Sequence, residues 1–128
     1  MNWTVVAAVA AGGAIGSAAR YMVTVLVQRA FGAGFPWWTL SVNVVGSFVM
    51  GVLVTAIALR WSVGQTGQAF LMVGLLGGFT TFSAFSLDVA TLVERNAVLS
   101  AGGYIAGSVV LSIGALFAGM AMARALLA

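Results

Sequence analysis

The 128-residue chain contains no cysteine, no histidine and no lysine. Without cysteine it forms neither a disulfide nor a thiolate metal site, and without histidine it lacks the usual general base and a common metal ligand. Its acidic side chains are Asp88 and Glu94 alone, so no pair of carboxylates lies deep in an apolar segment. The five basic residues are dispersed arginines, which do not form a nucleic-acid-binding surface. We therefore expect neither an enzyme nor a nucleic-acid partner.

What the chain does contain is apolar sequence, with 62% hydrophobic and 5% charged residues. A soluble domain of this size has too little interior to bury so much apolar surface. Four long apolar segments cover about residues 3–28, 37–59, 69–93 and 97–123. Each exceeds the roughly 20 residues needed to cross a bilayer core, and all four tryptophans lie near segment ends. The sequence predicts one all-α transmembrane domain, residues 1–128, with four spans.

The charges outside these spans are balanced between the two membrane faces. Four spans place the first and third connections, with Arg29 and Arg95, on one face, and the second connection and the C-terminus, with Arg60 and Arg124, on the other. The positive-inside rule therefore favours neither orientation. A chain that inserts both ways can form an antiparallel homodimer with a twofold axis in the membrane plane. We expect a multi-pass protein of the inner (plasma) membrane, present in both orientations as this dual-topology dimer.

The third segment contains a stretch, from Gly74 to Ser86, that is unfavourable for a continuous helix. Gly77 and Gly78 are followed by Thr80 and Thr81. Glycine costs roughly 1 kcal/mol of helix propensity against alanine, and threonine is stiff at χ1. One interpretation is a helix broken near its middle, with freed backbone groups satisfied by protein, an ion or water. The alternative is that the glycines only let neighbouring helices approach closely.

Polar residues recur at helical spacing in the second and fourth segments. Residues four apart share a helix face, and two such rows are present: Thr39, Asn43 and Ser47, then Tyr104, Ser108 and Ser112. Hydrogen bonds between helices are the simpler interpretation, at about 1 kcal/mol or less each. Rows of hydroxyls and an amide without carboxylates also offer the donors that an anion needs.

Four further side chains have two interpretations each. Phe82 and Phe85 are three residues apart, and they either pack against lipid and helices or present positive ring edges to a small anion. Arg20 either reaches the lipid interface or forms a cation in a vestibule of an anion path. Asp88, near the end of the third segment, is expected to cap a helix or pair with an arginine rather than to catalyse a reaction.

Three blocks of sequence together resemble the Fluc family of small fluoride channels, also called CrcB proteins. They are residues 12–16 (GGAIG) with Arg20 and Tyr21, residues 39–48 (TLSVNVVGSF) and residues 74–85 (GLLGGFTTFSAF). These blocks lie in the first three segments, and the resemblance as a whole covers all four. The third block usually reads TTFSTF in the family, and Ala84 departs from that pattern. The resemblance implies a dual-topology homodimer with two antiparallel pores that passively export fluoride and lower its cytoplasmic concentration.

The resemblance also implies roles for individual residues. Those implied to line the fluoride path are Asn43, Phe82, Phe85, Tyr104, Ser108 and Ser112. A structural sodium ion at the dimer centre would be bound by the backbone carbonyls of Gly77 and Thr80 in the broken helix. Some relatives continue the polar row with a threonine where this chain has Leu116.

Two other functions compete with a passive anion channel. Small multidrug transporters also have four helices and dual topology, but they need a membrane-embedded glutamate in the first span. This chain has no acid before Asp88. A subunit with a purely structural or assembly role is the third possibility, against which the two polar rows argue.

Overall fold

The computed structural model describes all residues, 1–128, and is all-helical. Four helical segments are long and apolar enough to cross a membrane: Trp3–Phe31, Trp37–Leu59, Gln65–Glu94 and Val98–Leu127. The prediction of an all-α protein with four membrane-spanning segments is confirmed at this level. The bounds differ, because the first segment reaches Phe31 rather than residue 28, the third begins at Gln65 rather than 69, and the fourth ends at Leu127 rather than 123.

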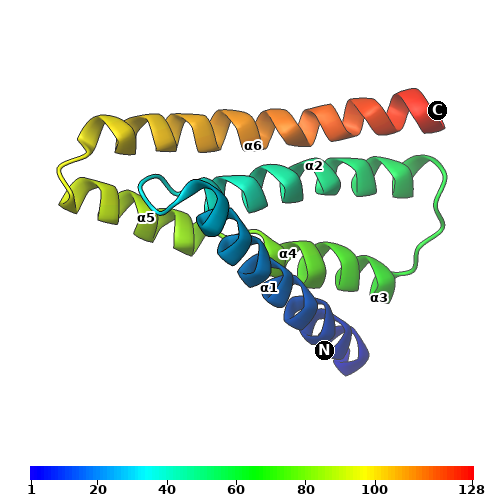
Figure 1. Cartoon of the computed structure of the whole chain (residues 1–128). Coiled ribbons are helices and arrows are strands. Elements are labelled where there is room, and N and C mark those ends of the chain that lie inside the picture. The colour runs from blue at the N-terminus through cyan, green and yellow to red at the C-terminus, as the bar shows by residue number, and fades with distance from the viewer.

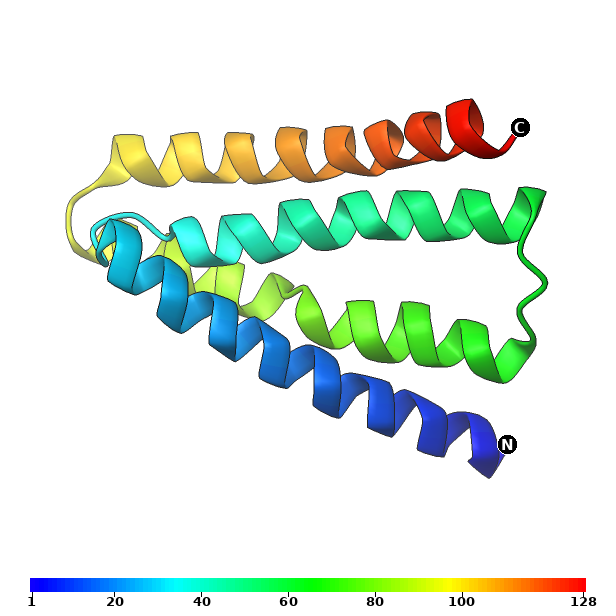
Figure 2. The ribbon, with the colours of Figure 1, turned by 45° about the vertical axis from the view of Figure 1, so that its right-hand side comes forward.

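The chain folds into two rows of helices with a helix across one of them. Its elements are α1 (Trp3–Phe31), α2 (Trp37–Leu59), α3 (Gln65–Gln68), η1 (Ala69–Leu76), α4 (Gly77–Phe79), α5 (Phe82–Glu94) and α6 (Val98–Leu127). Helices α2 and α6 run side by side. A second row is formed by α3, η1, α4 and α5, and α1 lies obliquely against its α3, η1 and α4 part (Figure 1). Both termini lie at the end of the molecule that holds the α2–α3 loop. The α1–α2 loop and the α5–α6 turn lie at the opposite end (Figure 2). The connections are therefore paired on two faces as the four-span prediction requires.

Helices α2 and α6 touch through backbone atoms at two glycines. A Cβ added at Gly51 would lie 2.1 Å from the carbonyl oxygen of Leu116, and one added at Gly119 would lie 2.2 Å from that of Phe48. Any larger side chain at either position would push the two backbones apart. Small residues at such crossings let helix backbones approach closely enough for van der Waals packing, which helps to drive helix association in lipid.

Glycines also bring α1 against the third segment. A Cβ at Gly16 would lie 2.1 Å from the Leu75 carbonyl oxygen, and one at Gly78 would lie 2.8 Å from that of Gly13. Close packing is thus the reason for Gly78. It does not explain Gly77, where the nearest atom to an added Cβ is 3.6 Å away.

The backbone of the third segment changes its geometry twice. Residues Ala69–Leu76 form a π-helix, and after a short α-helical piece the chain is extended at Thr80 (φ −87°, ψ 159°) and Thr81 (φ −155°, ψ 123°) before α5 begins at Phe82. Within the stretch from Gly74 to Ser86, the two adjacent glycines, Gly77 and Gly78, are helical, and the extended residues are the threonines. The reason is a tertiary contact at Thr81, described below. The π-helix had no counterpart in the sequence-based prediction.

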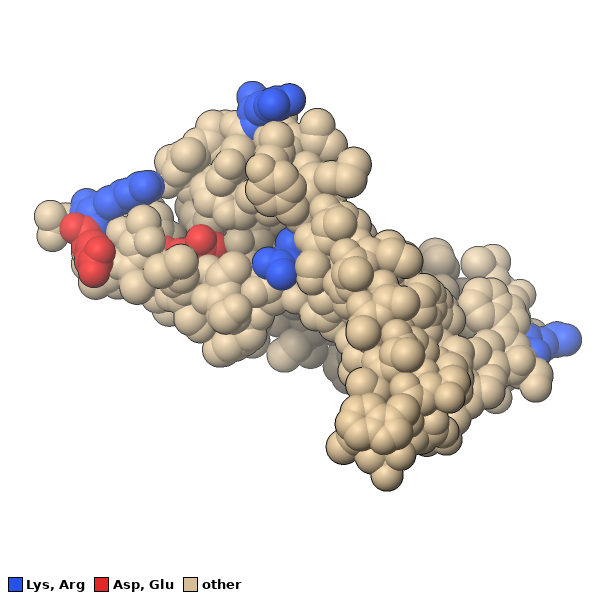
Figure 3. All heavy atoms as spheres, turned by 90° about the horizontal axis from the view of Figure 1, so that it is seen from below, with Lys and Arg blue, Asp and Glu red and all other residues tan.

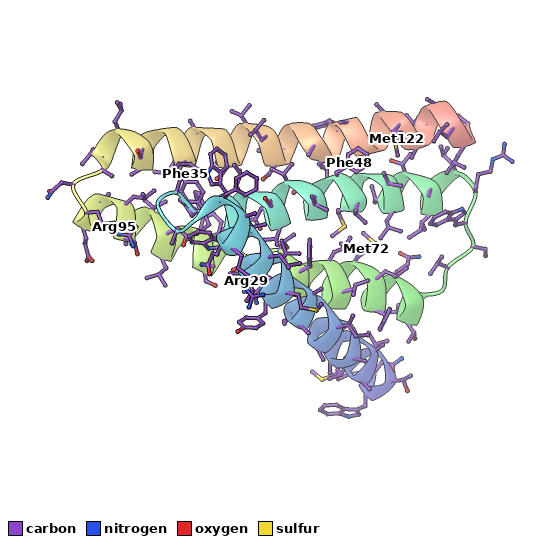
Figure 4. The ribbon with its side chains drawn as sticks, in the orientation of Figure 1. Arg29, Phe35, Phe48, Met72, Arg95 and Met122 are labelled. Atoms are coloured by element: carbon purple, nitrogen blue, oxygen red, sulfur yellow. The ribbon has the colours of Figure 1, made fainter.

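An aromatic cluster fills the end of the molecule that holds the α5–α6 turn. The Phe85 ring centroid lies 5.1 Å from that of Tyr104, and the Phe35 ring meets Tyr104 edge-on at 5.4 Å. Figure 4 shows Phe35 among rings between the α1–α2 loop and α6. The turn itself is tight because Asn96 takes a positive φ of 61°, which asparagine tolerates better than most residues. This cluster fixes α5 against α6 beside the candidate site.

Candidate functional site

A cavity of about 350 Å³ lies between α2, the interrupted part of the third segment and α6. Five of the six residues implied to form the fluoride path line it: Asn43, Phe82, Phe85, Ser108 and Ser112. Ser47, Thr80 and Leu116, which the sequence had also singled out, line it too. The side chains come from three segments far apart in sequence, so the tertiary structure brings most of the predicted path together. Tyr104 and Arg20 are absent from this lining. No carboxylate lines it either.

Asn43 holds the extended backbone at Thr81 through both of its polar groups. Its Nδ2 donates to the Thr81 carbonyl oxygen at 3.0 Å, and its Oδ1 accepts from the Thr81 N–H at 2.8 Å. The Asn43 side-chain amide thus bonds both backbone polar groups of Thr81, as the backbone of a neighbouring β-strand would. A side-chain amide has two N–H donors, so one remains available to a ligand in the cavity.

Thr81 also begins the helix that follows it. Its Oγ1 accepts a hydrogen bond from the Ala84 N–H at 3.1 Å, which makes it the N-cap of α5. No role was predicted for Thr81 from the sequence. A signal was present, because a threonine just before a new apolar helical run is a common N-cap, and such a cap contributes about 1 kcal/mol.

Two backbone carbonyls at the interruption lose their usual helical donors. In an α-helix the Gly77 carbonyl would accept from the Thr81 N–H and the Thr80 carbonyl from the Ala84 N–H. Both donors are taken by side-chain oxygens, those of Asn43 and Thr81. No group of three His, Cys, Asp or Glu side chains exists that could hold a metal ion. Gly77 and Thr80 therefore offer the oxygen atoms at this point that a hard cation could use.

Arg20 satisfies a third carbonyl in the same place. Its Nε donates to the Gly78 carbonyl oxygen at 3.0 Å, so the guanidinium is half-buried against the end of α4. Arg20 also lines a second cavity, of about 380 Å³, which Thr39 and Thr81 share. Thr81 lines both cavities, so the interruption separates them. The sequence alone did not link Arg20 to the third segment.

Ser108 and Ser112 are the polar residues of α6 that line the main cavity. Both Oγ atoms are buried and have no hydrogen-bond partner in the protein. A hydroxyl in that situation costs about 1–3 kcal/mol unless something else pairs with it. Within the single chain, these two serines therefore do not form the hydrogen bond between helices that was the simpler interpretation.

The two phenylalanines differ sharply in exposure. Phe85 is 8% exposed and belongs to the aromatic cluster, whereas Phe82 is 77% exposed in the single chain. Their ring centroids lie 5.4 Å apart with the planes tilted by 54°. Ring edges, which carry positive potential, can therefore reach the cavity from both residues.

Tyr104 continues the row of Ser108 and Ser112 one turn earlier but lies outside the cavity. Its hydroxyl donates to Oδ2 of Asp88 at 2.9 Å, and the side chain is 1% exposed. Asp88 was expected to cap a helix or pair with an arginine, and its partner is this hydroxyl instead. The reason is that α5 and α6 pack side by side after the tight turn, which places the two side chains opposite each other.

Comparison with known proteins finds relatives over nearly the whole chain. Residues 7–120 match the family model described as CrcB-like protein, Camphor Resistance (CrcB). A protein of Nitrobacter winogradskyi named fluoride-specific ion channel FluC is 52% identical over 124 residues, covering 97% of this chain and 98% of its own. One of Rhodospirillum centenum with the same name is 56% identical over 117 residues, covering 91% and 93%. A third, of Agrobacterium fabrum, is 52% identical over 119 residues, covering 93% and 95%.

These relatives are named as ion channels, so the predictions of the family and of a protein that is not an enzyme are both confirmed. The family match extends over all four membrane-spanning segments. The chain belongs to the CrcB-like protein family.

Proposed function

We propose that this protein is a passive, fluoride-selective channel that exports fluoride and lowers its cytoplasmic concentration. The observation that carries the proposal is the pair of buried, unpartnered hydroxyls at Ser108 and Ser112 in a cavity that no carboxylate lines. Such a cavity offers hydroxyl donors to an anion and has no carboxylate that would favour a cation. The names of the relatives support fluoride as the anion.

The lining suits a small anion with a tightly held charge. The spare N–H of Asn43 and the two serine hydroxyls can donate to it, and the edges of Phe82 and Phe85 can contact it without offering a competing acceptor. We assign the fluoride path to these five residues together with Tyr104, which stands on the same face of α6. A proton-coupled drug transporter would need an acid facing this cavity, and Asp88 faces Tyr104 instead.

The functional unit in this proposal is an antiparallel homodimer present in both membrane orientations. The Phe82 side chain and the main cavity that it lines are open at the surface of the single chain. Polar groups facing lipid are unfavourable, so a second copy that covers this opening would stabilise it. Each end of the molecule has two arginines, so neither direction of insertion is preferred. The chain would therefore insert in both orientations, and the antiparallel dimer needs one copy of each.

A structural sodium ion is part of the same proposal. The third segment would cross the membrane as two half-helices, with the Gly77 and Thr80 carbonyls at the junction. Two chains would bring four such oxygens to the twofold axis, where a cation relieves their mutual repulsion. The diversion of both helical donors to side chains supports these two carbonyls as the ligands.

Fluoride efflux from liposomes that contain only the purified protein tests the function. Fluoride-loaded vesicles should empty when a potassium ionophore is added, and chloride-loaded vesicles should not. Equal rates for the two anions would contradict selectivity, and proton-coupled drug uptake would support the transporter instead.

Topology and sodium need separate measurements. A single cysteine at Ser62, beside Arg60, should be modified from both sides of the membrane in roughly equal amounts, and labelling from one side only would exclude the antiparallel dimer. Replacing sodium by N-methylglucamine should loosen the dimer or lower the flux without changing which anion passes. A high-resolution map without density between the paired Gly77 and Thr80 carbonyls would contradict the ion site.

A further inference from the structure

The two ends of the molecule carry different side-chain charges. At the end with the α5–α6 turn, Arg29 and Arg95 are offset by Asp88 and Glu94 on α5, and Arg95 donates to the Ala33 carbonyl oxygen at 3.4 Å. Figure 3 shows the acidic side chains gathered toward this end, with basic ones nearby. The opposite end holds two arginines and no acidic side chain. The two chain termini, which have opposite charges, also lie there (Figure 2).

Those two arginines lie on adjacent helix ends. Arg60 follows α2, and its Nε donates to the Leu127 carbonyl oxygen at 2.7 Å, which holds the guanidinium over the end of α6. Arg124 lies in the last turn of α6. Both side chains are exposed. A guanidinium has five N–H donors, so one backbone contact leaves most of those on Arg60 free for a ligand.

An apolar cavity lies beside Arg124. It has a volume of about 390 Å³ and lies between α2 and α6, with Val54, Leu59 and Met120 among its apolar lining residues. Arg124, Thr55 and the last residue, Ala128, also line it. Arg124 thus belongs both to the basic pair and to the mouth of the cavity. The combination of a positive rim and an apolar interior fits a molecule with an anionic head and a hydrocarbon tail.

We propose that an anionic phospholipid binds here, with its phosphate between Arg60 and Arg124 and the first part of an acyl chain in the cavity. The arginines also compensate the partial negative charges at the C-terminal ends of α2 and α6. That role needs no neighbouring cavity, so it does not explain why the cavity is there. Arginine forms paired hydrogen bonds to phosphate, and each basic residue near a bilayer surface contributes about fivefold to the binding of anionic lipid. The site is separate from the proposed ion path.

Native mass spectrometry of the full-length protein in detergent tests the site independently of ion flux. Phosphatidylglycerol and phosphatidylcholine with identical acyl chains would be added at equal concentrations. We expect phosphatidylglycerol to be retained in preference. Arg124→Gln should lower its retention about fivefold, and Arg124→Lys, which keeps the charge, should restore most of it. Size-exclusion profiles of each variant would verify that the fold is intact.

Arg29→Gln is the matched control, because Arg29 also lies in the last turn of a long helix and its loss changes the net charge equally. It should leave lipid retention unchanged. An equal fall in that variant, or equal retention of the two lipids, would overturn the proposal. Displacement of phosphatidylglycerol by inorganic phosphate alone would also overturn it, since it would reveal an anion site that makes no use of the acyl chain.

Discussion

The α2–α6 pair and the third segment meet the same membrane environment in opposite ways. In the pair, ordinary α-helices approach until backbone touches backbone at Gly51 and Gly119. In the third segment the helix changes pitch, stops at Phe79 and restarts at Phe82. Side chains from other helices satisfy some of its freed backbone groups: Asn43 bonds the N–H and the carbonyl of Thr81, and Arg20 bonds the Gly78 carbonyl.

The difference shows how one small chain separates stability from function. Backbone that is fully paired within its own helix can be packed tightly, and it leaves no backbone group free for a ligand. Backbone that leaves the helix must find other partners in lipid. Here these partners place Asn43, a residue with one spare donor, at the edge of a cavity. The interruption costs helix hydrogen bonds and creates the polar site.

The largest effect is expected where the tight pair is forced apart. Gly119→Val would place a branched side chain against the Phe48 carbonyl, and we expect a loss of about 3 kcal/mol or failure to fold. Thermal stability followed by size-exclusion chromatography measures it. Gly102→Ala, in the same helix with no atom within 4 Å of an added Cβ, should be neutral or slightly stabilising. If the Gly119→Val protein were as stable as the Gly102→Ala protein, the close approach at Gly119 would not be important for stability.

Breaking the support of the interruption should have the next largest effect. Asn43→Leu leaves the N–H and the carbonyl of Thr81 without a partner, which should cost about 2 kcal/mol or more. Asn43→Asp keeps the acceptor for the N–H, so it should be more stable than Asn43→Leu while fluoride efflux is lost, because it places a negative charge beside the path. Equal stability of the wild type and Asn43→Leu would show that the side chain does not hold this backbone.

The two phenylalanines should separate stability from flux. Phe85→Ile removes a buried ring that packs on Tyr104 and should cost about 1 kcal/mol. Phe82→Ile, at an exposed ring, should cost much less in the detergent-solubilised protein. Both should lower fluoride efflux if ring edges contact the ion. Normal efflux in both variants would exclude these rings from the path.

The smallest change in stability is expected at the unpartnered serines. Ser108→Ala and Ser112→Ala remove hydroxyls that make no hydrogen bond in the protein, so stability should stay within about 0.5 kcal/mol or rise. Fluoride efflux should nevertheless fall. Ser41→Ala is the control: Ser41 bonds the Trp37 carbonyl and does not line the cavity, so efflux should be unchanged. A clear loss of stability in the Ser108 or Ser112 variant would restore their interpretation as helix-packing hydrogen bonds.

The sequence by itself determined the class of protein and the residues worth testing. Four continuous apolar segments of more than 20 residues indicate four helices, because a helix of that length crosses the bilayer core and pairs its backbone within the segment. Helical spacing placed Ser108 and Ser112 on one face, and they do line one cavity. These properties depend on local periodicity, which can be read without knowledge of the neighbours.

The tertiary structure alone decided where the third helix stops and what its glycines do. Gly77 and Gly78 have the weakest intrinsic preference for a helix, yet they are helical, and the extended residues are Thr80 and Thr81. The helix stops there because the Asn43 amide, from a segment 38 residues away in sequence, takes both backbone groups of Thr81. Local propensity amounts to about 1 kcal/mol, and two hydrogen bonds from a neighbouring helix exceed it.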